Sequence, residues 1–331
     1  MNETLQALAL RFIENRDAIR AVFRMENDYI YPVCAQIFLA ADLTVEKERL
    51  EACKALVKST TGVFSNFRGN IKLPLLCMLA VGDDPEARWD RTERCYALLK
   101  ETFLGSEYLA LAALLLADTV KEEDIPPLAA RGKALYKRMR KEHPLLTGQE
   151  DSVFALLLAQ SPRPDDELIE DMETCYTLLN ERFHGGNGLQ TASHVLALSQ
   201  EIPADKAFRM ISLFNAIEAG GGKYGKDHQL PILAALSLGQ RFSENMARDI
   251  LEVDGFLAKQ KGYRGVFGMD RRTRTLHAAM LLSLPDRGDG QQEVVRAAAQ
   301  QATLSMIVAQ QALMCAVVAS SAAATAVSSA H

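Results

Sequence analysis

The sequence contains no short motif that identifies a reaction, and its scarce residue types exclude several classes of site. It has one tryptophan and six cysteines, and no two cysteines form a CxxC pair. Cys77 lies in an apolar run, and Cys95 and Cys175 occupy equivalent positions in two similar segments. This pattern favours small core residues over metal or redox chemistry. We therefore expect no metal site, and catalytic residues and cofactors stay unassigned.

A surplus of basic residues is also missing, because the formal net charge is −5. A protein that binds the nucleic-acid backbone needs a cationic face, so nucleic acid is not an expected partner. The N-terminal sequence MNETLQALALRF carries an early acidic residue and lacks the pattern of a secretory signal peptide. We expect a cytoplasmic protein.

The chain does have a recurring apolar run, and its hydrophobic content of 48% supports a large core. The dipeptide Leu-Ala or Leu-Ser ends such a run about every 40 residues. The leucines of these dipeptides are Leu39, Leu79, Leu116, Leu158, Leu198, Leu236 and Leu282. A helix that is apolar all round is buried all round. A period near 40 residues is typical of helix-pair repeats.

The segments between the runs mix apolar and charged residues at helical spacing. ERCYALLKET at 93–102 and ETCYTLLNERF at 173–183 are near copies of one another. Such segments are typical of half-exposed helices that cover the buried ones. The sequence therefore predicts an all-α fold of about seven helix-hairpin repeats of roughly 40 residues, arranged as an α/α toroid or an α-solenoid.

The predicted repeat domain covers residues 1–290, and a capping helix at 3–24 hides the face of its first repeat. Residues 291–331 are rich in alanine and serine, and no Asp, Glu, Lys or Arg follows Arg296. Three interpretations of this C-terminal segment remain open. It is a helix packed on the last repeat or on a partner chain in a homo-oligomer, a mobile tail, or a membrane contact through Ala297–Ser320.

Polar clusters precede the apolar runs. In GGGKYGKDHQLPILAALSLG at 220–239, the glycines end one helix and Asp227 is the expected N-cap of the next. Equivalent positions of a repeat lie on one rim, so we expect these clusters to line a common ligand site. The candidates are Glu150, Asp151, Asn187, Gln190, Lys226, Asp227, His228, Asp270, Arg271, Arg272 and Arg274. Taken singly, each is also explained as a helix cap or turn residue.

Three arginines among positions 271–274 are unusual at a helix start, where the backbone is already electropositive. Either they pair with acidic residues of neighbouring units, or they bind an anion. His194, His228 and His277 also lie near helix starts. Their distances from the Leu-Ser marker differ, so we do not expect them to share a zinc ion.

The glycine-aromatic turns GGGKYG and GYRGVFG, each followed by an apolar helix, resemble the repeats of α/α-toroid proteins such as prenyltransferase β subunits and terpenoid cyclases. That resemblance implies inner helices around a central cavity. The chemistry does not transfer, because the Asp-x-Cys and Asp-x-Asp-Asp motifs of those enzymes are absent. The whole chain, including its uncharged end, resembles the uncharacterised bacterial family called domain of unknown function 4003.

Three functions remain open at this point. The first is a binding protein that holds a peptide, a protein or a small anionic ligand at the rim. The second is a toroid-cavity enzyme of unknown reaction that uses Asp227, His228 and the 270–274 cluster. The third is a membrane-associated or self-assembling scaffold that works through residues 291–331.

Overall fold

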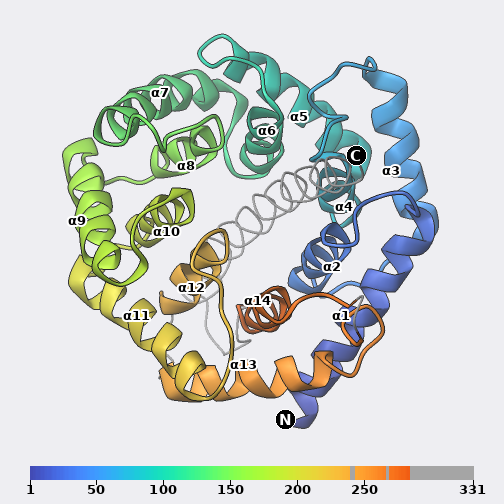
Figure 1. Cartoon of the computed structure of the whole chain (residues 1–331). Helices are drawn as coiled ribbons and strands as arrows, with labels where there is room; N and C mark the ends of the chain where they lie inside the picture. Colours follow the sequence, from blue (N-terminus) through green and yellow to red (C-terminus); the bar gives the residue numbers. More distant parts are fainter. Residues whose placement is uncertain (239–242, 266–267, 284–331) are drawn as a thin grey trace, which may run out of the picture. The chain divides into compact units, whose positions relative to one another are not determined.

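The computed structural model describes residues 1–238, 243–265 and 268–283, and every regular element in these ranges is a helix (Figure 1). The all-α prediction is confirmed. The segment at 291–331, with its three interpretations, lies outside the described residues. The elements are α1 (Glu3–Val22), α2 (Ile30–Ala40), α3 (Lys47–Thr60), α4 (Lys72–Ala80), α5 (Pro85–Lys100), α6 (Glu107–Thr119), the 3-10 turn η1 (Glu122–Asp124), α7 (Ile125–Glu142), α8 (Asp151–Leu158), α9 (Asp165–Phe183), α10 (Asn187–Ala197), α11 (Pro203–Ala219), α12 (Leu230–Ser237), α13 (Ser243–Leu257) and α14 (Arg271–Leu282).

The chain divides into two compact units. Unit 1 contains Met1–Leu10 and the described residues from Leu128 onward, with most of α7 and all of α8 to α14. Unit 2 contains Arg11–Pro127, with most of α1 and all of α2 to α6. A single repeat domain over residues 1–290 stays a prediction.

Within each unit, helices that are buried all round alternate with helices that bury one face (Figure 1). The apolar run of α2 is buried from Ile30 to Leu39, and that of α6 from Leu109 to Leu116. In α3, by contrast, the buried side chains are Leu50, Cys53 and Val57, spaced by three and four residues. We call the even-numbered helices inner and the odd-numbered helices outer. Each fully buried leucine of an inner helix stabilises the fold by about 2 kcal/mol.

Five arginines, which we call the arginine clamps, donate hydrogen bonds to main-chain carbonyls at the ends of inner helices. They are Arg49 to Gly82, Arg88 to Met78, Arg131 to Ala159 and Ser161, Arg163 to Ala197 and Ser199, and Arg209 to Ser237. The last carbonyls of a helix lack intrahelical donors and carry partial negative charge. The clamps supply both the missing donors and the opposite charge.

Candidate functional site

The sequence-predicted site residues all lie at the starts of inner helices of unit 1. Glu150 and Asp151 begin α8, Asn187 and Gln190 lie in the first turn of α10, Lys226 to His228 precede α12, and Asp270 to Arg274 begin α14. Adjacent starts are linked by the contacts described below. Whether they bind a ligand stays a prediction.

Asp151 of α8 forms a buried polar cluster with Gln190 and His194 of α10, whereas the candidate Glu150 is half-buried and the candidate Asn187 is exposed. Asp151 and His194 are each 2% exposed, and the Asp151 Oδ1 and His194 Nδ1 atoms are 3.3 Å apart. Gln190 Nε2 donates to Thr147 Oγ1 at 2.8 Å, and Asp151 Oδ2 accepts from the Gly148 amide at 2.9 Å. These bonds join α10 to the segment that leads into α8. Asp151 and Gln190 therefore face the interior instead of the solvent.

The loop at 220–229 joins α11 to α12 and differs from its prediction. Tyr224 is buried, and its hydroxyl donates to the Gln229 carbonyl at 2.9 Å. Asp227 was the expected N-cap of α12, and this prediction was wrong. Gln229 occupies the N-cap position without a side-chain hydrogen bond, and the main-chain carbonyl of Asp227 accepts from the Leu230 amide at 2.8 Å. The turn thus begins with the Asp227 backbone, and the Asp227 side chain is exposed.

Glycine at position 188 allows this loop to pack directly on α10. A Cβ atom at Gly188 would overlap the main-chain carbonyl of Asp227. Only hydrogen occupies that space, so the backbone of α10 and the backbone of the loop are in contact. The start of α10 and the segment that leads into α12 are therefore held side by side.

The acidic residue at the start of α14 is a helix cap. Asp270 accepts hydrogen bonds from the amides of Arg272 and Thr273, at 2.8 and 3.3 Å, and from the Thr273 hydroxyl. Burial alone raises the pKa of Asp270, but these hydrogen bonds and the Arg272 charge outweigh it and hold the pKa below its usual value. The carboxylate is ionised, and its hydrogen-bonding capacity is directed into its own helix.

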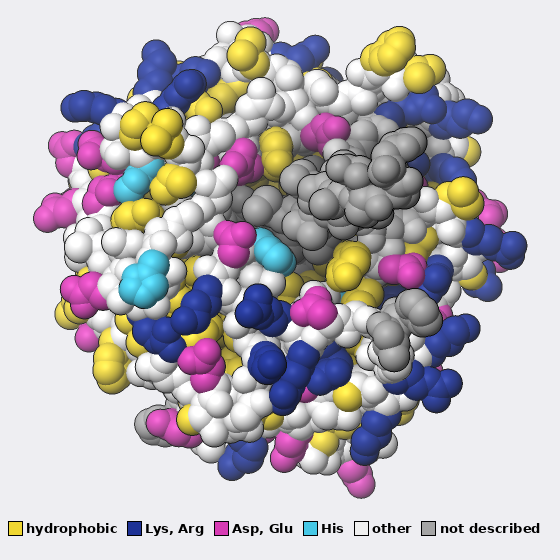
Figure 2. All heavy atoms as spheres, in the orientation of Figure 1, with side chains coloured by type: hydrophobic (Ala, Val, Ile, Leu, Met, Phe, Trp, Pro, Cys, Tyr) yellow, Lys and Arg dark blue, Asp and Glu magenta, His cyan; other side chains and the backbone are white. Residues whose placement is uncertain are grey.

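Arg274 and Arg271 of α14 contact different partners. Arg274 pairs with the buried Asp254 of α13, with N–O distances of 2.9 and 3.1 Å, which is the neighbouring-acid alternative. Arg271 Nη2 donates to the Gly221 carbonyl at 2.5 Å and so ties α14 to the α11–α12 loop. Arg271 and Arg272 are both exposed at the helix start. Figure 2 shows Lys and Arg side chains gathered over the part of unit 1 that holds α12 and α14.

His228 is the titratable group of this surface. Burial lowers the His228 pKa below its ordinary value, against the opposing influence of the Asp227 and Asp270 carboxylates. The imidazole is therefore neutral at pH 7 and carries a charge only below its ordinary titration range. The exposed Lys226, Arg271 and Arg272 lie on the same loop and helix start. We call these four residues the cationic surface.

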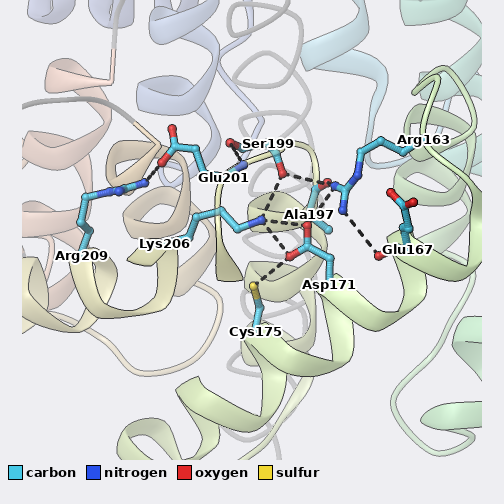
Figure 3. A network of polar contacts seen from close by, with 9 residues as sticks. All are labelled: Arg163, Glu167, Asp171, Cys175, Ala197, Ser199, Glu201, Lys206 and Arg209. Atoms are coloured by element: carbon cyan, nitrogen blue, oxygen red, sulfur yellow. Dashed lines mark hydrogen bonds and ion pairs between the residues drawn. The ribbon is translucent and has the colours of Figure 1, made fainter. Parts of the chain in front are cut away.

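A second polar network was not predicted from the sequence (Figure 3). Lys206 Nζ on α11 lies 2.8 and 2.9 Å from the two carboxylate oxygens of Asp171 on α9, and it donates to the Ser199 carbonyl at 3.1 Å. Arg163 Nη1 lies 2.9 Å from the same carboxylate. Asp171 belongs to an acidic run at the start of α9 that resembles surface charge. The available signal was its spacing from Leu168 and Cys175, which places it on the apolar face of α9.

This buried network has a structural role and not a catalytic one. Lys206 is fully buried and Asp171 is 4% exposed, so a soluble substrate does not reach them. Burial raises the pKa of the adjacent Cys175 thiol to about 12, which leaves it protonated and unreactive at neutral pH.

Within the described ranges, no group of three or more His, Cys, Asp or Glu side chains is arranged to hold a metal ion. Over the same residues, no helix has the length and apolar character that a bilayer span requires.

Comparisons with known proteins agree with the family resemblance. A family model described as "Protein of unknown function (DUF4003)" matches residues 15–312. A curated relative, "Uncharacterized protein YeaA" of Bacillus subtilis (strain 168), is 22% identical over 252 residues, which cover 73% of this chain and 74% of the relative. No solved structure matches the chain.

Proposed function

The chain belongs to the family described as "Protein of unknown function (DUF4003)", and from its geometry we propose that it is a binding protein for small anions or acidic peptide groups. The ligand binds at the cationic surface of unit 1. This choice narrows the wider set of peptide, protein and small anionic ligands to those that carry a negative charge. The proposal includes no catalytic step.

The observation that supports this proposal is the placing of Lys226, Arg271 and Arg272 at helix starts. A helix N-terminus is already electropositive, so cations there are unfavourable without nearby anions. The Asp227 and Asp270 carboxylates stand against the three cations, which leaves a net positive charge for an anionic ligand. The Asp270 carboxylate accepts hydrogen bonds from its own helix, and Asp254 is paired with Arg274. The guanidinium of Arg271 keeps further N–H donors beyond the one directed to Gly221. The surface thus offers charge and donors to an anionic group.

We further propose that the alternating inner and outer helices are seven repeats of one helix pair, stacked as an α-solenoid or closed as an α/α toroid. Repeat arrays present extended binding surfaces built from equivalent positions. The recurrence of the arginine clamps at the ends of α4, α8, α10 and α12 supports a common repeat. Small-angle scattering distinguishes the two arrangements, because an open array is more elongated than a closed ring.

The binding proposal is tested by calorimetric titration of the full chain with inorganic phosphate, pyrophosphate and a short glutamate peptide. We expect saturable binding of at least one probe, and a loss of about ten-fold in affinity in Arg271→Ala/Arg272→Ala, which corresponds to about 1.4 kcal/mol. The matched control is Arg248→Ala, because Arg248 lies on the outer helix α13 away from the helix starts. Binding that Arg248→Ala weakens equally, or no binding of any probe, would falsify the proposal.

The Asp151–His194 pair favours an enzyme as the second candidate. A carboxylate beside an imidazole is used in general acid–base catalysis, and His194 Nδ1 lies 3.3 Å from Asp151 Oδ1 without forming a hydrogen bond. We rank this function lower because both side chains are 2% exposed, so a substrate needs an opening to reach them. Hydrogen exchange at the α8 and α10 amides tests it. If a substrate reaches the pair, the amides of α8 and α10 should exchange faster than those of the neighbouring inner helix α12.

A further inference from the structure

Three loops of unit 2 place apolar side chains in solvent. Each loop joins the end of an outer helix to the start of an inner helix: residues 23–29 before α2, 61–71 before α4 and 101–106 before α6. Their most exposed apolar side chains are Met25 at 96%, Phe64 at 100% and Leu104 at 83% exposed. Isolated apolar residues on a surface are ordinary, but one on each of three successive equivalent loops is a pattern.

The same loops are anchored by buried phenylalanines. Phe23, Phe67 and Phe103 are between 4% and 6% exposed, one in each loop. The Phe67 ring packs edge-on against Trp89 and Tyr96, with ring centroids 4.8 Å apart in both pairs. Each loop therefore has one apolar side chain in the core and another in solvent. The anchors hold the exposed side chains in place.

Basic residues lie in the helix turns that precede these loops. The last turn of each outer helix of unit 2 contains a cation, namely Arg20 in α1, Lys58 in α3 and Lys100 in α5. A cation in this position also complements the helix dipole, which accounts for part of the pattern. Long basic side chains near apolar loop residues are able to reach phosphate groups while their aliphatic stems rest on apolar surface.

The three loops lie at one end of unit 2. Each follows an outer helix and precedes an inner helix, and contacts join neighbouring loops. Lys72 Nζ at the start of α4 lies 3.1 Å from Glu26 of the first loop, and the Asn70 amide of the second loop donates to Glu107 at the start of α6 at 2.8 Å. A protein partner requires a contiguous patch of matching shape, whereas a lipid interface accepts separate protruding apolar groups.

We propose that this end of unit 2 is a docking surface for a lipid bilayer, on which Met25, Phe64 and Leu104 enter the headgroup region. Lys58 and Lys100 then lie at the height of the lipid phosphates, which strengthens binding to anionic lipids, whereas Arg20 is paired with Asp28 of the first loop at 3.1 Å. The contact is peripheral and reversible. It does not depend on the anion-binding function proposed for unit 1 or on residues 291–331.

Vesicle co-sedimentation of the full chain tests the proposal. The vesicles are phosphatidylcholine with and without a minority of phosphatidylserine. The test variant is Met25→Ser/Phe64→Ser/Leu104→Ser, and the control variant is Leu43→Ser/Ile202→Ser/Phe208→Ser, which removes three other exposed apolar side chains at 42%, 65% and 71% exposure. We expect the test variant to lose about ten-fold or more in partition coefficient, while the control keeps the wild-type value.

The other outcomes overturn the inference. Wild-type protein that does not sediment with either vesicle has no such surface. Equal sedimentation of wild type and test variant assigns membrane binding to another part of the chain, and equal loss in both variants shows general hydrophobic adhesion. Wild-type dimers in light scattering that the test variant abolishes, without vesicle binding, assign the surface to contacts between two copies of the chain.

Discussion

The ammonium group of Lys206 lies 2.8 Å from the Asp171 carboxylate, and the two side chains are 0% and 3% exposed. The pair joins α11 to α9, and Arg163 contacts the same carboxylate from the loop between α8 and α9. Two charges removed from water are costly, and their attraction repays that cost only when both are present. The network therefore stabilises the native helix packing against any arrangement that separates these charges.

Replacement of Lys206 by methionine tests this dependence. The variant leaves a buried carboxylate with Arg163 as its remaining cation, and we expect the free energy of unfolding to fall by about 3 kcal/mol. Urea denaturation monitored by circular dichroism measures the change. The double variant Lys206→Met/Asp171→Leu should lose less than Lys206→Met alone, because it leaves no buried carboxylate without its main partner. The control is Arg94→Met, whose pair with Glu122 is more than half exposed on both sides and should cost under about 1 kcal/mol.

A second prediction concerns two helical glycines with opposite expected effects. Gly188→Ala places a methyl group against the Asp227 carbonyl and should lower stability by about 1–3 kcal/mol, because two backbones must move apart. Gly255→Ala in α13 meets nothing within 4 Å and should raise stability by about 0.5–1 kcal/mol through helix propensity. The denaturation midpoints of the two variants, compared with that of the wild type, measure both changes in stability. Equal effects of the two substitutions would contradict the close approach of α10 and the α11–α12 loop.

The pKa of His228 gives a third prediction, with opposite signs for stability and binding. Its pKa is lowered in the folded protein, so the unfolded chain binds more protons just below pH 6.5. The His228 contribution to stability is present above that pH and declines as the pH falls. Anion affinity should instead rise over the same interval, because the imidazolium adds positive charge to the cationic surface. His228→Gln should remove both dependences, as followed by denaturation and by phosphate titration at several pH values.

The described cysteines provide a fourth prediction. Cys34, Cys53, Cys77, Cys95 and Cys175 are buried, and burial raises the pKa of Cys95 and Cys175 to about 12. Native protein at about pH 8 should therefore leave these thiols unalkylated by iodoacetamide, whereas urea-unfolded protein should react at all five. Peptide mass spectrometry measures the labelling at each position. Rapid native labelling of Cys95 or Cys175 would show that the outer helices open readily.

The helices were predictable because they depend on local pattern. A run such as that of α6 has too few polar groups to face water, so its helix is buried whatever it packs against. The buried pair of Asp171 and Lys206 was not predictable in the same way, because its members are 35 residues apart in sequence. Which turn of α9 faces which turn of α11 is set by packing, and no local rule reports it. The acidic run around Asp171 resembles surface charge, and its spacing from Leu168 and Cys175 indicates burial without identifying Lys206 as its partner.

The start of α12 shows a different reason why prediction from the sequence failed. Asp227 has the right chemistry for an N-cap, but the chain turns so that its carbonyl, and not its carboxylate, meets the helix. The arginines of α14 are a further example. Among three cations in four positions, Arg274 faces α13 and pairs with its Asp254, whereas Arg271 donates to the Gly221 carbonyl. Residue type predicted the chemistry available at each site, while the direction of each side chain followed from tertiary packing.

The arginine clamps have a consequence for synthesis on the ribosome. Arg131 finds its carbonyl partners at Ala159 and Ser161, and Arg163 finds its own at Ala197 and Ser199. Each of these guanidinium groups emerges from the exit tunnel well before the helix end that it binds. A nascent chain thus holds its newest cation unsatisfied until the following helix pair has been made. For Arg131 and Arg163, each new helix pair therefore completes the one before it.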